Sequence, residues 1–166
     1  MDAKQIKDEG LKLYRDARYE EAAAKFAEAQ QAFVTEGNGK EAAECLNNRG
    51  VCWRQAAKFD EATAAFEEAR AAFQALNDAM GEAQVLGNLA ALAESKGDNK
   101  VALELYQQAA DIFEKLNEQS YVKDTYTAIS KLKLKQRDFM GAIASFDVGL
   151  EQLDNPNLVE RMARKI

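Results

Sequence analysis

The stretch LNNRGVCWRQAAKFDEATAAFEEARAAF, from Leu46 to Phe73, decides the fold, because its pattern recurs every forty residues along the 166-residue chain. Small and aromatic residues return at matching positions in each copy. Three series keep their residue class throughout: Ala22, Ala62, Ala102 and Ala142; Phe26, Phe66, Tyr106 and Phe146; Ala29, Ala69, Ala109 and Gly149. Self-similarity at a fixed period of this size is typical of a stacked array of repeats.

Each repeat carries the periodicity of two helices. Ala22, Phe26, Ala29 and Phe33 fall at i, i+4, i+7 and i+11, which places them on one face of a helix. The helix before them contains Gly10, which recurs as glycine in the next copy. Because a glycine inside a helix costs about 1 kcal/mol relative to alanine, its reuse predicts a close crossing between the two helices.

We therefore predict an all-α fold, a right-handed α-solenoid of four helix-turn-helix repeats closed by a C-terminal capping helix. The chain is expected to form a single domain over residues 1–166. The repeats are expected at about 3–38, 43–78, 83–118 and 123–155, and the capping helix at 156–166. The run Gly37, Asn38 and Gly39 is expected to end a helix and connect the first two repeats.

Composition excludes several classes of function. A formal net charge of −6 disfavours nucleic acid as a partner, and no stretch has the apolar length of a signal peptide or a bilayer span. The chain has no histidine, and Cys45 and Cys52 lie seven residues apart on one predicted helix, beyond disulfide reach. We expect a soluble, cytoplasmic protein that does not bind membranes, has no metal or cofactor and is not an enzyme. The two cysteines are expected to be small apolar packing residues.

The order of side chains resembles the tetratricopeptide repeat (TPR) family. The residues that carry the resemblance are a small residue in the first helix followed by an aromatic, an alanine, an aromatic and an alanine: Gly50, Phe59, Ala62, Phe66 and Ala69. The resemblance extends from about residue 3 to residue 155. The family's usual repeat has about thirty-four residues. The longer repeat here, with Leu46–Asn48 and Leu86–Asn88, looks most like the arrays of kinesin light chains.

The TPR resemblance implies a concave groove, lined by the first helices of successive repeats, that receives an extended peptide. The residues implied are Lys4, Lys7, Leu11, Tyr14, Asn47, Asn48, Val51, Arg54, Gln84, Asn88, Ala91, Asp124, Lys131 and Lys135. With their neighbours they include more cations than anions: Lys4, Lys7, Arg15, Arg54, Lys131 and Lys135 against Glu44, Glu94 and Asp124. An acidic peptide segment is therefore the expected ligand. Asn48 and Asn88, forty residues apart, are expected to bind its main chain.

The resemblance leaves the choice of partner open. Heat-shock co-chaperones of the same family grip a terminal carboxylate, and Lys7 and Asn48 fit that pattern. Leu11, Gln84 and Asn88 do not fit it, which disfavours chaperone tails as ligands. The leading hypothesis is a protein-interaction scaffold or adaptor that is a monomer or weak homo-oligomer. The alternative is a structural or self-associating repeat protein that assembles through its end faces.

Overall fold

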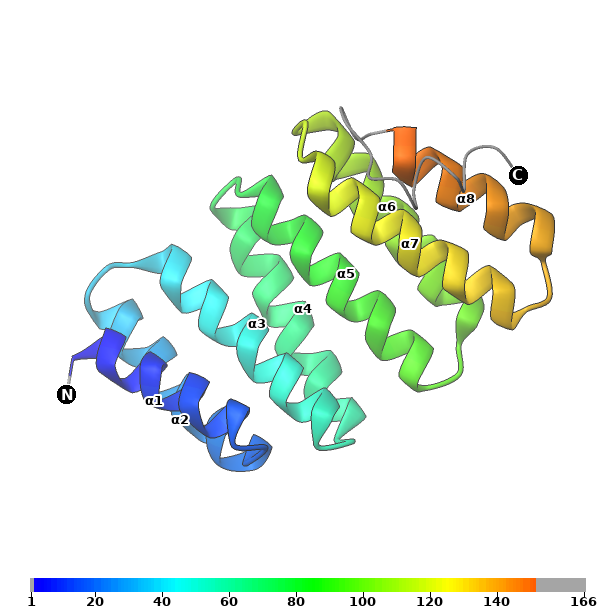
Figure 1. Cartoon of the computed structure of the whole chain (residues 1–166). Helices are drawn as coiled ribbons and strands as arrows, with labels where there is room; N and C mark the ends of the chain where they lie inside the picture. Colours follow the sequence, from blue (N-terminus) through cyan, green and yellow to red (C-terminus); the bar gives the residue numbers. More distant parts are fainter. Residues whose placement is uncertain (1, 152–166) are drawn as a thin grey trace.

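The computed structural model describes residues 2–151, which form eight helices and no strand. The helices are α1 (Ala3–Arg15), α2 (Tyr19–Thr35), α3 (Gly39–Gln55), α4 (Phe59–Ala75), α5 (Ala79–Ser95), α6 (Asn99–Lys115), α7 (Gln119–Lys135) and α8 (Phe139–Glu151). Figure 1 shows α1, α3, α5 and α7 side by side as one layer, with their partner helices forming the second. The predicted all-α repeat fold is confirmed. The predicted capping helix at 156–166 lies outside the described residues.

Three-residue turns separate the helices at intervals of twenty residues. The middle residue of every turn has a positive φ: Ala17, Gly37, Ala57, Asn77, Gly97, Asn117 and Arg137. The residue that follows donates its N–H back into the preceding helix, as Asn38 does to the Phe33 carbonyl at 2.8 Å. This bonding satisfies carbonyls that the end of a helix leaves without partners. The same turn therefore serves within repeats and between them.

The turns place the first helices of later repeats earlier than expected. α3, α5 and α7 begin at Gly39, Ala79 and Gln119, four residues before the expected repeat starts. Gly39 therefore belongs to a helix and not to the connector. Asn38 ends the connector by accepting a hydrogen bond from the Glu41 N–H at 3.3 Å, which caps the start of α3.

Glycine in the first helices allows the aromatic rings of the second helices to approach closely. A Cβ atom added at Gly50 would lie 2.5 Å from Cδ1 of Phe66, and one added at Gly10 would lie 3.1 Å from Cε1 of Phe26. Phe26 and Phe66 are almost completely buried. The close helix crossing predicted at the two glycines is therefore present, and it forms the centre of each pair.

Both cysteines are buried and unbridged, so the structure confirms them as packing residues. Burial raises the pKa of each thiol to about 12. Trp53, which follows Cys52, is half-buried between the cores of the first and second repeats. The Lys58 ammonium lies 5.2 Å from the centre of its ring. Trp53 is thus a packing residue between two repeats.

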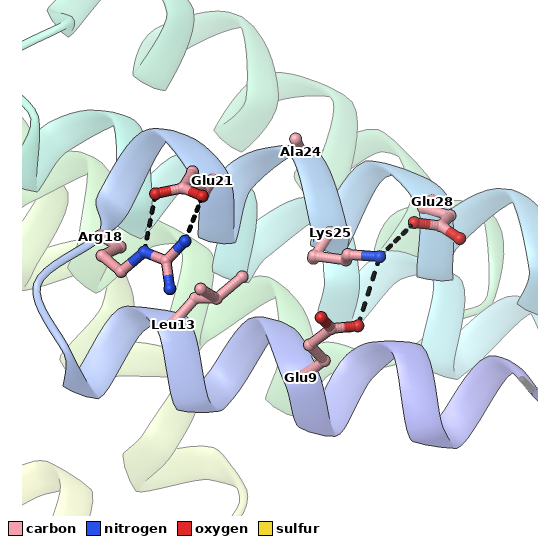
Figure 2. A pocket seen from close by; sticks show the side chains of 7 residues that line it. All are labelled: Glu9, Leu13, Arg18, Glu21, Ala24, Lys25 and Glu28. Atoms are coloured by element: carbon pink, nitrogen blue, oxygen red, sulfur yellow. Dashed lines mark hydrogen bonds and ion pairs between the residues drawn. The ribbon is translucent and has the colours of Figure 1, made fainter.

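The N-terminal face of the array carries charged side chains that form ion pairs with one another. Figure 2 shows Lys25 of α2 between Glu9 of α1, at 3.3 Å, and Glu28, at 3.0 Å. Beside it, the Arg18 guanidinium donates to both carboxylate oxygens of Glu21. A terminal repeat has no neighbour on its outer side, so a polar outer face keeps this end of the array compatible with water.

Candidate functional site

The residues predicted to line a groove lie on the layer formed by α1, α3, α5 and α7. None of the fourteen is buried: Lys4, Asp124, Lys131 and Lys135 are exposed and the other ten are half-buried. We call the outward side of these four helices the first-helix surface. The helical stripe predicted from the sequence therefore faces away from the core, as a binding surface requires.

Side chains on this surface connect consecutive repeats through hydrogen bonds at two recurring spacings. One spacing is forty-one residues, which joins Gln55 to the Tyr14 hydroxyl at 3.3 Å and Asn88 to Asn47 at 2.8 Å. The other spacing is thirty-seven residues, which joins Gln84 to the Tyr121 hydroxyl at 3.4 Å. The strictly equivalent residue is forty positions away. An offset of forty-one is therefore displaced from it by one residue, and an offset of thirty-seven by three residues, or about one helical turn. The neighbouring first helices are thus held in a fixed register.

The structure gives the two equivalent asparagines, Asn48 and Asn88, different surroundings. The Asn88 side-chain N–H bonds to Oδ1 of Asn47, so Asn88 has a partner within the protein. Asn48, its equivalent by forty residues, makes no side-chain hydrogen bond within the described chain. This bond uses one N–H of the Asn88 amide and leaves its second N–H and its Oδ1 for other partners, so peptide binding by both amides stays a prediction. Asn48 offers its whole side-chain amide to a ligand, whereas Asn88 offers the remaining part of its own.

Two of the predicted groove cations have carboxylate partners. Lys7 Nζ lies 2.6 Å from Glu41 and 2.7 Å from Glu44, both on α3. Burial opposes the charged form of Lys7, but the two carboxylates outweigh it and raise its pKa. Lys135 on α7 pairs with Glu94 on α5. Glu44 and Glu94 were already counted among the groove anions, so these ion pairs add only Glu41 to the balance, and the excess of cations stays a prediction.

Glu41 is a residue that the sequence analysis missed. It lies three residues before Glu44 on α3, so both carboxylates project from the same side of that helix toward α1. The signal was available in this spacing. It could be read only after the register between α1 and α3 was known.

Arg54 retains a positive charge on the first-helix surface. It is half-buried and has no ion-pair partner in residues 2–151, and its Nε atom is buried without a hydrogen bond. Arg54 lies close enough to Tyr106 to oppose the rise in the pKa of that phenol, which burial and Glu94 together raise to about 12. Arg54 is therefore a cation on a partly desolvated site, where a carboxylate binds more strongly than it does in open water.

The first-helix surface has small residues on α5. Because Asn88 bonds to Asn47, Gly87 is level with Leu46 of α3, about two turns before Arg54. A Cβ atom at Gly87 would meet nothing within 4 Å, so no packing contact requires a glycine there. The equivalent residues in the other repeats are larger: Lys7, Asn47 and Thr127. Ala91, one turn further along α5, is also small. Glycine and alanine leave room for another backbone to lie against this helix.

The described part of the chain carries no feature of two other kinds of site. No helix in residues 2–151 has the length and apolar character to cross a bilayer. In the same residues, no three histidine, cysteine, aspartate or glutamate side chains are grouped as metal ligands.

Many solved structures resemble the fold, among them the following three. BtubC (BKLC) from P. vanneervenii is 22% identical with a TM-score of 0.78, and the match covers 93% of this chain and 67% of that one. The Rap conjugation gene regulator of the plasmid pLS20, in complex with the Phr* peptide, is 20% identical with a TM-score of 0.78. That match covers 98% of this chain and 42% of the regulator. Pseudomonas aeruginosa PilF is 17% identical with a TM-score of 0.53, over 97% of this chain and 80% of its own.

These likenesses support a TPR-like repeat fold, and the chain spans less than half of the Rap regulator. No curated protein matches the sequence. The model of the soluble NSF attachment protein family, SNAP, matches residues 2–165. Because that match covers nearly all of the 166 residues, the chain belongs to the soluble NSF attachment protein family.

Proposed function

We propose that the chain is a protein-interaction scaffold that binds an extended, acidic peptide segment of a partner across the first-helix surface. The observation that carries the proposal is Arg54 of α3, which has no ion-pair partner in residues 2–151, together with the small residues Gly87 and Ala91 on α5, one to two turns before its level. The peptide backbone would lie over α5, with an acidic side chain at Arg54 and the Asn48 amide on its main chain. Binding is proposed without catalysis and without a cofactor.

Membership of the SNAP family and the TPR-like fold favour a protein or peptide partner. The Rap regulator, a relative in fold, was solved with a peptide. The likeness of the long repeats to kinesin-light-chain arrays and the cytoplasmic location remain predictions that fit such a scaffold.

The test begins with capture of a partner from native lysate and identification of its bound segment as a synthetic peptide. Affinity is then measured by calorimetry over a salt series. Arg54→Glu should weaken binding about tenfold or more at low salt, because it places a carboxylate where the peptide carboxylate binds. Gly87→Gln should also weaken binding, because its side chain would fill the space above α5.

Controls separate loss of binding from loss of fold. Lys100→Glu makes the same change of charge on α6, in the other layer, where Lys100 is exposed. This variant should bind normally. Gly87→Ala should melt at or above the temperature of the parent protein, since alanine favours a helix by up to about 1 kcal/mol. Normal peptide affinity in both Arg54→Glu and Gly87→Gln would contradict the proposal.

A second candidate function, self-association, is favoured by the exposed apolar side chains on α8. Phe139 is 61% exposed, Met140 78% and Ile143 53%. An exposed apolar cluster of this kind is typical of a surface that another element or another molecule covers. If copies of the chain meet there, light scattering should show a mass that rises with concentration, and Met140→Glu with Ile143→Lys should restore the monomer. A constant monomer mass in the parent protein would exclude this candidate.

A further inference from the structure

A cleft of 290 Å³ opens where α4, α5 and α6 meet. Its floor is apolar, with Leu89, Leu92, Ala93 and Leu105, and its rim carries Thr63, Glu67, Lys96, Asp98 and Val101. Leu89 and Ala93 lie roughly 100–160° around α5 from Asn88 and Ala91, at about 100° per residue. The cleft is therefore separate from the first-helix surface.

The cleft exists because one repeat position holds a small residue. Forty residues before Ala93 stands Trp53, whose indole packs between the cores of two repeats. Forty residues after it stands Lys133, whose ammonium donates to the Ser145 hydroxyl at 2.9 Å. A long side chain of the protein thus occupies this position in both neighbouring repeats. At Ala93 the methyl group leaves the equivalent space open.

In the second repeat the Trp53 side chain fills the equivalent space, and it indicates which kind of side chain the cleft can bind. There the indole of Trp53 lies against apolar side chains, with the Lys58 ammonium 5.2 Å from its ring centre. Asp98 stands at the position of Lys58, forty residues on, so the open cleft has an anion where the filled one has a cation. Glu67 adds a second carboxylate to the rim, against the single cation Lys96.

We propose that this cleft binds one aromatic side chain of a partner segment, with a basic residue beside the aromatic one. The aromatic ring lies on Leu89, Leu92 and Leu105 as Trp53 lies in the preceding repeat, and the basic side chain faces Glu67 and Asp98. The volume of 290 Å³ lies at the lower limit of pockets for drug-sized ligands, about 300 Å³, and has room for one aromatic side chain. The proposal uses a different side of α5 from the proposed peptide surface, so either one can fail without the other.

The test uses two probes, N-acetyl-tryptophanamide and the dipeptide acetyl-Lys-Trp-amide, titrated into the protein while methyl resonances are followed by NMR. Both probes should shift the methyl signals of Leu89, Leu92 and Leu105 saturably, and Leu11 on α1 serves as the distant reference. The dipeptide should bind more tightly. Glu67→Lys should weaken the dipeptide about two- to fivefold, the size expected for an exposed ion pair, and leave N-acetyl-tryptophanamide unchanged.

Filling the cleft from within should abolish binding. Ala93→Trp copies the residue of the second repeat and Ala93→Lys copies that of the fourth, so at least one of them is expected to fold. In either variant the methyl shifts at Leu92 and Leu105 should disappear. Absence of saturable shifts in the parent protein would overturn the proposal. So would shifts that persist in a folded Ala93 variant, or tighter binding of the dipeptide by Glu67→Lys.

Discussion

The junction between the first and second repeats, where α2 meets α3, is packed more closely than the junction where α4 meets α5. Small residues face each other at the first: Ala23 of α2 meets a side of α3 that carries Cys45 and Cys52, all fully buried. At the second, the position of Ala23 holds Thr63, and Val85 and Leu92 stand where the cysteines were.

The difference shows that side-chain volume sets the spacing between repeats independently of the register. Both junctions have the same helix lengths and the same three-residue turns. Thiols and alanines let two helices approach, whereas Leu92 keeps α5 further from α4 and Ala93 beside it leaves the cleft. One backbone plan therefore gives a closed junction and an open one.

The largest effect is expected from truncating Leu92, the buried side chain of α5 at the open junction with α4. Leu92 is 2% exposed, so Leu92→Ala should leave a cavity and reduce the free energy of unfolding by about 2–5 kcal/mol. The matched change at the closed junction, Cys52→Ala, removes a group about the size of one methylene and should cost about 1 kcal/mol. Urea denaturation of both variants measures the contrast, and equal losses would show that Leu92 does not support the α4–α5 contact.

The next effect comes from adding volume to the closed junction. Cys52→Leu places a leucine, as at Leu92, at the equivalent position of α3, where the Cys52 side chain is fully buried. The overpacked variant should be less stable by about 1–3 kcal/mol. Leu92→Met, which conserves volume at the open junction, is the control and should cost less than about 1.5 kcal/mol. If Cys52→Leu is as stable as the parent protein, the closeness of the α2–α3 junction has another cause than small side chains.

The closed junction should also make stability depend on alkaline pH. Burial raises the pKa of Cys45 and Cys52 from 9.0 to about 12, so the folded state holds these protons longer than the unfolded chain does. The stabilisation is complete below about pH 9 and is lost as the pH rises toward 12, by at most about 1.4 kcal/mol per thiol per pH unit.

Comparison with a variant that lacks both thiols isolates this effect, because Tyr106 titrates in the same direction. Urea denaturation at pH 8 and pH 10 should show a smaller loss of stability in Cys45→Ala with Cys52→Ala than in the parent protein. An identical loss in the two proteins would mean that the thiols ionise in the folded state.

The sequence predicted the parts of the fold that repeat without exception. The forty-residue series of alanines and aromatics located each helix pair, and Gly10 and Gly50 located the close crossings. The starts of α3, α5 and α7 were misplaced by one turn, because the first residues of these helices lack the apolar stripe from which the boundaries were read.

The candidate site was predicted less completely, because its contacts depend on the offset between neighbouring helices. Strict equivalence by forty residues paired Asn48 with Asn88, whereas the actual offset of forty-one pairs Asn47 with Asn88. The cleft was missed for a different reason. Ala93 is one alanine among many, and only the structure shows that the space vacated by a long side chain stays open.

The smallest effect is expected at the turns, which the two repeats build with different residues. The turn after α3 has Ala57 at φ 57° and the turn after α5 has Gly97 at φ 81°. The residue after each donates the same hydrogen bond, Lys58 to Trp53 at 2.9 Å and Asp98 to Ala93 at 2.8 Å. A non-glycine residue at positive φ destabilises the folded state by about 1–2 kcal/mol. Glycine avoids that cost, but it lowers stability by about 0.4–1 kcal/mol because it raises the entropy of the unfolded chain.

Exchange of the two residues tests whether the turns are equivalent although the junctions are not. Ala57→Gly should stabilise the protein and Gly97→Ala should destabilise it, each by about 0.5–1 kcal/mol from the difference between those two terms. In a domain of this size that corresponds to a shift in the melting temperature of about 1–4 °C, up for the first and down for the second. Shifts of opposite sign and similar size would mean that the turns work alike at a closed and an open junction. A loss several times larger in Gly97→Ala would instead tie the α5–α6 turn to the packing of the cleft, since Lys96 and Asp98 on its rim flank Gly97.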